Sequence, residues 1–169
     1  MNTNKIAVVG IPGSGKSTVS RRIAKKTGLP LFHMDTLFWK SGWTLAPEAE
    51  YVAKQKEIIR TNERWIIEGY VDRPLSDSVT NADLIVYLDY PGWLCASRYA
   101  KRFFQYRNIT RPELPEDCYD RFHFNRFWMI LWHRERDVLE DALTLVKDQS
   151  KIVRLKSPRE LEEYLSSHI

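Results

Sequence analysis

The chain has 169 residues, of which 43% are hydrophobic and 28% are charged, and its formal net charge is +4. This length predicts one domain with its own core, and this composition excludes a disordered chain. No apolar run reaches the roughly 18–20 residues of a membrane span, and the first apolar stretch is too short for a secretory signal, so we expect a cytoplasmic protein without membrane contact.

The first elements along the chain are a short apolar run, a glycine-rich loop and an amphipathic segment. Residues 6–9 predict a buried parallel strand, and residues 18–27 predict a helix with one apolar face. Between them, residues 10–17 read Gly-Ile-Pro-Gly-Ser-Gly-Lys-Ser, which fits the phosphate-binding pattern of glycine, four residues, glycine, lysine and serine. A chance match in an ordinary strand-to-helix turn is the alternative, but strand, loop and helix stand in the order that the motif requires.

This loop predicts a site for ATP and Mg²⁺. At the glycines, backbone N–H groups can curl around phosphate oxygens, and the positive end of the following helix points at the same anion. Lys16 is expected to reach the β- and γ-phosphates, and the Ser17 hydroxyl to ligate Mg²⁺. The expected nucleotide-binding residues are Gly10, Pro12, Gly13, Ser14, Gly15, Lys16, Ser17 and Thr18.

Residues 29–34 predict a second strand, and Asp35 follows at its carboxyl end. Ligands of open α/β sheets bind just outside the carboxyl ends of the strands, so Asp35 is a candidate to orient or deprotonate an acceptor hydroxyl. The alternative is an N-cap for a short turn at 36–38. Trp39 and Trp43 come next, and they can equally stack on a ring at the mouth of the site or cap the core from a loop.

Residues 47–62 predict a helix with Ala49, Val52 and Ile59 on its inward face. Residues 65–69 predict the third strand, which ends in an acid and a glycine. An acidic residue that ends a strand beside a phosphate-binding loop commonly serves Mg²⁺, often through water, so Glu68 is a candidate for the metal shell.

Residues 84–88 predict the fourth strand, and a helix from 93 to about 106 follows with Leu94 and Phe104 among its inward residues. Arg98 and Arg102 are four residues apart and share one face of that helix. They can clamp phosphates at the edge of a nucleotide, or they can form a solvated basic face.

From 105 to about 122 the helical periodicity is lost, which predicts a mobile lid. Apolar residues from 124 to 146 then keep near-helical spacing, which predicts one long helix with a kink around 133–136. Arg134 and Arg136 would point back at the site if that stretch lies under the lid.

Residues 151–155 predict the fifth strand, and Ser157 begins a capping box for the last helix. Cys95 and Cys118 are widely spaced, which predicts plain thiols.

The alternation of strands and helices predicts an α/β fold: a three-layer P-loop NTPase fold over residues 1–169 as a single domain, with a five-stranded parallel sheet and a short lid insertion. The whole chain resembles the adenylate-kinase-like branch of the P-loop kinases, which implies the sheet order 2-3-1-4-5. That resemblance rests on the loop and on further motifs: Glu68-Gly69, the Leu-Asp-Tyr-Pro run at 88–91, Arg98 with Arg102, and the Ser-Pro turn after the last strand.

Within that branch the chain is most similar to bacterial proteins known as DNA topology modulation proteins. The similarity rests on residues 35–39, 65–70, 111–115 and 155–158. It implies a kinase-like fold that binds ATP. The topology label describes a cellular effect, and no DNA-reading motif is present in the sequence, although the basic excess suits nucleic acid as well as an anionic small substrate.

Our leading hypothesis is therefore a kinase that transfers the γ-phosphoryl group of ATP to a small acceptor, with a nucleoside or nucleotide among the candidates. The expected catalytic residues are Lys16, Asp35, Arg98, Arg102, Arg134 and Arg136, and the expected metal residues are Ser17 and Glu68. The alternatives are a nucleotide-binding regulator that affects DNA topology with little or no turnover, and a plain NTPase. The sequence leaves the acceptor and the oligomeric state open.

Overall fold

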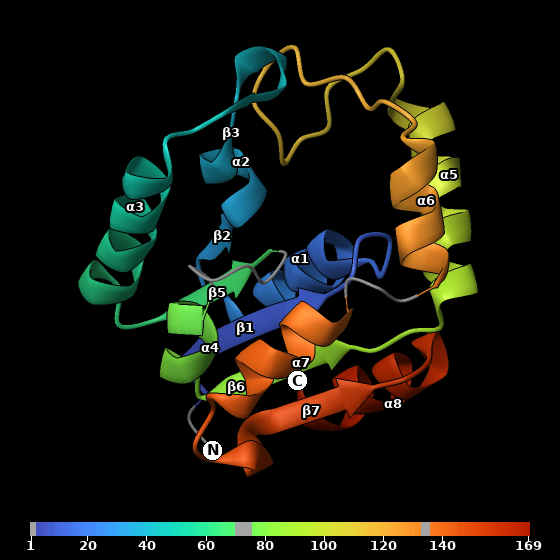
Figure 1. The fold of residues 1–169 in the computed structure, drawn as a ribbon. Coiled ribbons are helices and arrows are strands. Elements are labelled where there is room, and N and C mark those ends of the chain that lie inside the picture. The colour runs from blue at the N-terminus through green and yellow to red at the C-terminus, as the bar shows by residue number, and fades with distance from the viewer. Residues whose placement is uncertain (1–2, 70–75, 133–135) are drawn as a thin grey trace.

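The computed structural model describes residues 3–69, 76–132 and 136–169 of the chain. Its fold is built on a five-stranded parallel sheet (Figure 1). The strands stand in the order β2-β5-β1-β6-β7. Their bounds are β1 (Lys5–Gly10), β2 (Leu31–His33), β5 (Trp65–Glu68), β6 (Leu84–Leu88) and β7 (Ile152–Leu155). The predicted α/β fold is confirmed, and these five strands, counted along the chain, follow the expected order 2-3-1-4-5.

The strand labels run higher than the predicted count because the structure has two more short strands. They are β3 (Trp39–Lys40) and β4 (Thr44–Leu45), which pair antiparallel in a separate two-stranded sheet. A 3₁₀ turn, η1 (Ser41–Trp43), joins them. The sequence analysis did not predict this hairpin, because each strand is only two residues long and carries no alternating pattern.

Helices cover both faces of the sheet, which gives the predicted three layers (Figure 1). One apolar core lies between the sheet and the helices α1, α5, α6 and α8, and a second lies between the sheet and the helices α2, α3, α4 and α7. On the first face the helices are α1 (Lys16–Thr27), α5 (Gly92–Tyr106), α6 (Phe124–Leu131) and α8 (Pro158–His168). On the second they are α2 (Met34–Phe38), α3 (Glu48–Thr61), α4 (Ser76–Asn81) and α7 (Arg136–Thr144).

Local sequence signals set several boundaries of these helices. Gly28 ends α1 in the left-handed conformation, with φ of 68°, and donates its N–H to the carbonyl of Ala24 at 2.9 Å. The Ser157 hydroxyl accepts the N–H of Glu160 at 3.2 Å and so caps α8, whose first residue is Pro158. A short 3₁₀ turn, η3 (Gln149–Lys151), leads into β7.

The parallel register brings distant residues to the phosphate-binding loop. Val8 of β1 stands opposite Glu68 of β5, and Glu68 stands opposite His33 of β2. On the other side, Gly10 at the end of β1 stands opposite Leu88 of β6. Because all five strands run in the same direction, the residues that follow their carboxyl ends meet at one edge of the sheet.

Two predicted inward helix faces are only partly right: Val52 and Ile59 of α3 and Leu94 of α5 pack against the cores, but other residues of these faces do not. In α3 the buried residues are Tyr51 and Gln55, whereas Ala49 is exposed. In α5 the buried face is formed by Gly92, Cys95, Ala96 and Tyr99, and Phe104 is 67% exposed. The amphipathic pattern of α5 is ambiguous because its aromatic residues occur on several faces, and the contact with the loop decides which of them is buried.

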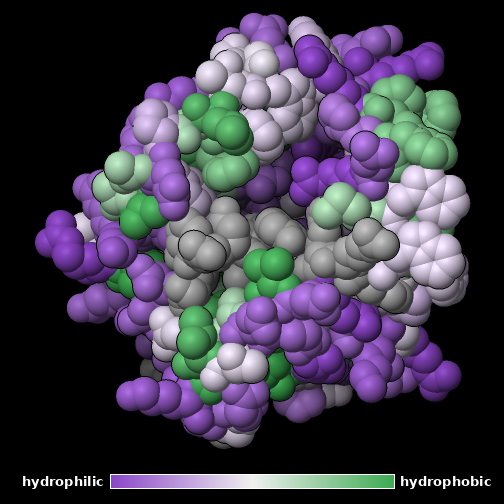
Figure 2. All heavy atoms as spheres, viewed as in Figure 1, coloured by the Kyte–Doolittle hydropathy of each residue, from purple (hydrophilic) through white to green (hydrophobic). Residues whose placement is uncertain are grey.

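The predicted long helix over 124–146 is divided into α6 and α7, and its proposed kink falls mostly outside the described residues. The only fully buried side chain of α6 is Ile130, whereas Phe124, Trp128 and Trp132 are 63%, 41% and 69% exposed. On the side of the molecule where α6 lies, Figure 2 shows apolar and weakly polar side chains at the surface. Within the described ranges, none of the helices combines the length and the apolar character that crossing a membrane requires.

The two tryptophans Trp65 and Trp93 give a matched test of this packing. Trp65 in β5 is completely buried, whereas Trp93 at the start of α5 is 65% exposed. We expect Trp65→Ala to lower the free energy of unfolding by about 3–5 kcal/mol, because it leaves a large cavity in the core. Trp93→Ala is expected to change it by less than about 0.5 kcal/mol. Urea titration followed by circular dichroism measures both, and equal midpoints would contradict the assigned core.

Candidate active site

The phosphate-binding loop joins β1 to α1 and lies against the first turn of α5. Gly13 has φ of 83°, and a Cβ atom built on it would stand 2.2 Å from the carbonyl oxygen of Cys95. No side chain fits in that space, and only glycine adopts this φ without strain. The glycine at this position is therefore required twice, by the turn of the loop and by its contact with α5.

Lys16 is the first residue of α1, and the first turn of that helix contains no acidic residue. The Lys16 ammonium donates to the carbonyl oxygens of Gly10 at 2.9 Å and Ile11 at 3.4 Å, so the side chain folds back over the loop. A helix N-terminus and an ammonium group at the same loop are the elements that bind phosphate groups. The loop residues from Pro12 to Thr18 all line the main cavity.

Glu68 lies beside the loop, as the sequence predicts. Its Oε1 atom accepts a hydrogen bond from the Ser17 hydroxyl at 3.1 Å and lies 2.6 Å from Nδ1 of His33. The side chain is almost fully buried, and the neighbouring strand holds it in place through the His33 contact. The sequence analysis missed His33, because a histidine in a short strand carries no signal of its contact across the sheet.

The chemistry of these donors fits Mg²⁺. A hydroxyl and a carboxylate are hard oxygen ligands, and Mg²⁺ commonly takes one or two protein ligands together with phosphate oxygens and water. Among the residues that the structure describes, no group of three or more His, Cys, Asp or Glu side chains could hold a metal ion by itself. Ser17 and Glu68 are therefore candidates for a site that a nucleotide would complete.

Asp35 lies in the first turn of α2 and lines the same cavity. It is not the N-cap of that helix, because His33 occupies the cap position. Burial raises the pKa of Asp35, and the negative charge of Glu68 raises it further. The positive charges of Lys16, Arg111 and Arg102 act in the opposite direction. A carboxyl group with a raised pKa in a cavity is a candidate for proton transfer.

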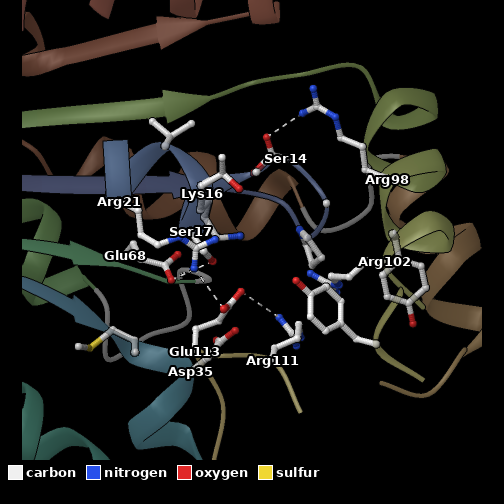
Figure 3. A pocket seen from close by; sticks show the side chains of 18 of the residues that line it. Ser14, Lys16, Ser17, Arg21, Asp35, Glu68, Arg98, Arg102, Arg111 and Glu113 are labelled. Atoms are coloured by element: carbon white, nitrogen blue, oxygen red, sulfur yellow. Dashed lines mark hydrogen bonds and ion pairs between the residues drawn. The ribbon is translucent and has the colours of Figure 1, made fainter. Parts of the chain in front are cut away.

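Arg98 and Arg102 of α5 both face the cavity, so the predicted alternative of a solvated basic face is wrong. Arg98 donates to the carbonyl oxygen of Ser14 in the loop at 3.1 Å and lies over the ring of Tyr90. Arg102 is one turn further along, where its Nε lies 3.5 Å from a carboxylate oxygen of Asp120. The two arginines therefore occupy different parts of the site, as Figure 3 shows.

The remaining two predicted arginines are Arg134 and Arg136. Arg134 lies outside the described residues. Arg136 forms an ion pair with Asp89, which follows β6, and Arg154 of β7 pairs with the same carboxylate at 3.2 Å. Arg136 is not among the residues that line the cavity. The expectation that it points at the site is wrong, because its guanidinium group is engaged at the edge of the sheet.

The irregular stretch 107–123 between α5 and α6, which we call the lid segment, contributes a buried group of charges. It corresponds closely to the predicted lid at 105–122, whose mobility remains a prediction. Arg111, Glu113 and Asp120 are all less than 10% exposed. Nε of Arg111 lies 3.2 Å from Asp120, and its Nη1 lies 3.8 Å from Glu113. Glu113 also pairs with Arg21 of α1 at 3.3 Å, and this pair joins the lid segment to the helix that follows the loop.

Arg21, Arg111, Glu113 and Asp120 were not predicted to belong to the site. In an irregular segment there is no periodicity to show which side chains turn inward. The motif Arg111-Pro112-Glu113-Leu114-Pro115, on which the resemblance partly rests, was the available signal.

The loop, Asp35, Glu68 and the arginines Arg98, Arg102 and Arg111 surround one cavity of about 750 Å³ (Figure 3). Figure 2 shows a recess on this side of the molecule with hydrophilic side chains inside it. Four aromatic residues form part of its wall: Phe38, Trp39, Trp43 and Tyr51. Trp39 and Trp43 therefore lie at the site, and Trp43 Nε1 donates to the carbonyl oxygen of Tyr119 at 2.7 Å. The volume and lining suit a nucleotide together with a small second ligand.

The chain is similar in sequence to known kinases. The cytidylate kinase of Archaeoglobus fulgidus is 30% identical over 139 residues, which are 73% of this chain and 74% of that protein. The cytidylate kinase of Pyrococcus horikoshii is 33% identical over 108 residues, which are 57% of this chain and 56% of that protein. No protein-family model matches the chain. These relatives support the kinase part of the predicted resemblance and give no support to the DNA topology modulation subtype.

Solved structures agree with the fold. The deoxyadenosine kinase of M. mycoides with bound dATP aligns with a TM-score of 0.56 at 17% identity, over 96% of this chain and 97% of that one. The shikimate kinase of Acinetobacter baumannii in complex with shikimate aligns with a TM-score of 0.55 at 16% identity, over 98% and 90% of the two chains. At these identities the likeness establishes the fold alone.

The contact between Gly13 and α5 leads to a test of the loop. We expect Gly13→Ala to weaken the binding of an ATP analogue by at least about tenfold, because the loop must move away from Cys95 and leave its conformation. Gly42→Ala is the control: Gly42 also has a positive φ, of 69°, but a Cβ there meets nothing within 4 Å. Isothermal titration calorimetry compares the two, and unchanged affinity in Gly13→Ala would refute the role of this contact.

Proposed function

The chain belongs to the kinase family of the archaeal cytidylate kinases, and on that premise we propose that it transfers the γ-phosphoryl group of ATP to a hydroxyl group of a small acceptor. One observation carries the proposal: the phosphate-binding loop with Lys16 and the carboxyl group of Asp35 line the same cavity. The loop suits the donor, and a carboxylate near it suits an acceptor that must lose a proton.

The donor end of the cavity is formed by the loop, Lys16 and Arg98. Loop N–H groups and the N-terminus of α1 attract phosphate oxygens, and Lys16 adds a positive charge at the same place. Arg98 contacts the loop through the Ser14 carbonyl, so its guanidinium group lies beside the proposed phosphate site. Arg102 lies one turn further along α5 and is the candidate for the transferring group.

Ser17 and Glu68 would hold Mg²⁺, directly or through water, and the ion would neutralise charge on the phosphate oxygens. The contact with Nδ1 of His33 at 2.6 Å fixes the Glu68 carboxylate where that role needs it. Glu68 is held by the neighbouring strand, and Ser17 in the first turn of α1 donates its hydroxyl to Glu68, so the two side chains position one another.

Asp35 is proposed to receive the proton of the acceptor hydroxyl. A bond forms between the acceptor oxygen and the γ-phosphorus, and the bond between that phosphorus and the oxygen that bridges it to the β-phosphorus breaks. ADP leaves with the electron pair of the broken bond, and the proton moves to the Asp35 carboxylate. Burial and Glu68 raise the pKa of Asp35, and the nearby positive charges act against this rise. A carboxyl group with a raised pKa suits a role in which it gains and loses a proton.

The experiment that tests this proposal measures ADP release across nucleosides, nucleotides and sugars, together with DNA retention at two salt concentrations. ADP release that an acceptor stimulates supports the kinase. DNA binding that weakens steeply with salt, without any acceptor, would support the regulator instead. ADP release that no acceptor stimulates would support a plain NTPase.

Lys16→Ala tests the donor end. We expect it to weaken ATP binding by about 10- to 150-fold, because a hydrogen bond to a charged group is worth about 1.5–3 kcal/mol. Lys40→Ala is the control, since Lys40 is an exposed lysine that pairs with Glu50 on the surface. Calorimetry with ATP gives both affinities. Full affinity and turnover in Lys16→Ala would contradict the assignment of the loop.

Asp35→Asn tests the acceptor end. We expect phosphoryl transfer to fall by roughly 10²–10⁴-fold, because the amide cannot accept the proton, while ATP affinity stays close to that of the wild type. In the wild type the rate should fall as the pH drops through the raised pKa of Asp35, because the carboxylate becomes protonated, and this dependence should be absent in the variant. The exposed Asp141→Asn on α7 is the control. A wild-type rate in Asp35→Asn would exclude the proposed role.

A further inference from the structure

The two ends of the cavity carry their charges differently. At the loop end, Arg98 donates to a backbone carbonyl group, which has no net charge. At the other end, which we call the acceptor end, Asp35, Glu113 and Arg111 lie together, as Figure 3 shows. The guanidinium groups at the acceptor end face carboxylates rather than carbonyls. This difference bears on which acceptor the cavity can take.

The arginines of the acceptor end form a chain of ion pairs. Arg21 lies 3.3 Å from Glu113, Glu113 lies 3.8 Å from Arg111, Arg111 lies 3.2 Å from Asp120, and Asp120 lies 3.5 Å from Arg102. Three guanidinium groups thus share two buried carboxylates, and the Asp35 carboxyl group lies near the same arginines. Coulomb attraction at these distances holds even where the hydrogen-bond geometry is not ideal, as for Nε of Arg102 and of Arg111.

A phosphate or carboxylate on the acceptor would meet this arrangement unfavourably. It would have to displace Glu113 or Asp120 from its arginine, and each of these carboxylates would then be left in a buried position without its partner. It would also approach Asp35, whose carboxylate carries charge of the same sign. Three further arginines line the cavity: Arg22, Arg121 and Arg126. Arg22 pairs with Glu162 at 2.6 Å, and Arg121 and Arg126 are exposed and lie at the α6 side.

The remaining wall of the cavity suits a ring. Phe38 and Trp39 pack edge to face with centroids 5.0 Å apart, and Trp39 and Trp43 do the same at 5.0 Å. The hydrogen bond from Trp43 to the lid segment fixes this indole ring. Aromatic walls bind the apolar faces of rings, and carboxylates such as Asp35 accept hydrogen bonds from hydroxyl groups.

From these observations we infer that the acceptor is an uncharged, ring-bearing polyol. The aromatic wall and the Asp35 carboxylate recognise it, and the arginines at this end already pair with Glu113 and Asp120. Nucleosides and free sugars are the two sources of this chemistry. The inference rests on the proposed function, because it names the acceptor of that same site. It differs from what the names of the cytidylate kinase relatives indicate for those proteins, whose acceptor carries a phosphate.

Matched pairs of acceptors test the inference directly. Cytidine is compared with CMP, deoxyadenosine with dAMP, and glucose with glucose 6-phosphate, each at fixed ATP and Mg²⁺, with ADP release as the readout. We expect the uncharged member of at least one pair to have a kcat/KM at least about 100-fold higher than its phosphorylated partner. Preference for a nucleoside or for glucose identifies the source, and either outcome supports the inference.

The outcomes separate this inference from the proposed function. If a phosphorylated member is preferred, the acceptor class is overturned while the kinase remains. If ATP binds but no member of any pair stimulates ADP release, the proposed function fails and this inference fails with it. Calorimetric titration of each acceptor in the presence of a non-hydrolysable ATP analogue gives an independent measure of the same preference.

A variant of the ion-pair chain provides a second test. Asp120→Asn removes the carboxylate that Arg102 and Arg111 share, so the arginines should attract an anion. We expect the ratio of kcat/KM for the phosphorylated member to that for the uncharged member to rise by at least about tenfold. Thermal unfolding by circular dichroism checks that the variant is folded.

If Asp120→Asn does not fold, Glu113→Gln makes the same test at the other carboxylate, because it leaves Arg111 and Arg21 without that charge. Glu116→Gln is the matched control, since Glu116 lies in the same lid segment but is exposed. An unchanged ratio in a folded Asp120→Asn or Glu113→Gln variant would overturn the claim that ion pairing sets the acceptor class.

Discussion

The approach of the phosphate-binding loop to α5 is the contact on which the rest of the site depends. A Cβ on Gly13 would lie 2.2 Å from the Cys95 carbonyl oxygen, so the loop and the helix can pack at this distance only because the residue is glycine. α5 also carries Arg98 and Arg102. The same contact that shapes the loop therefore sets the position of both arginines relative to the loop.

The parallel sheet supplies the second constraint. Its register sets Glu68 beside His33 on one side and beside Val8 on the other, and Val8 comes two residues before the loop. Three segments that are far apart in the chain therefore contribute to one small region. The carboxylate of Glu68 is buried and contacts both Ser17 and His33. A buried carboxylate needs such partners, because taking a charge out of water is costly. The partners also restrict its rotamer, which is what a metal shell requires.

The two ends of the cavity differ in how their charged groups are arranged. Ion pairs between the lid segment, α1 and α5 engage the guanidinium groups at one end of the cavity with carboxylates, whereas the helix N-terminus and Lys16 make the loop end attractive to anions. Charges are poorly screened in a partly buried cavity, so the arrangement of these carboxylates has a strong effect on the local potential. Away from the loop, the wall of the cavity includes residues of α2, η1 and the lid segment.

The sequence by itself determined the loop, the order of strands and helices, and the residues at the carboxyl ends of the strands. These features are local: a glycine pattern, continuous apolar runs and cap residues such as Gly28 and Ser157 act within a few residues. Glu68 and Asp35 were found for the same reason, since each directly follows or ends a strand. Only the tertiary structure decided that Arg136 pairs with Asp89, that Phe104 faces outward, and that Arg111 and Asp120 are buried together. Those outcomes depend on contacts between segments that share no periodic pattern, and a side chain on an irregular stretch takes its direction from what it packs against.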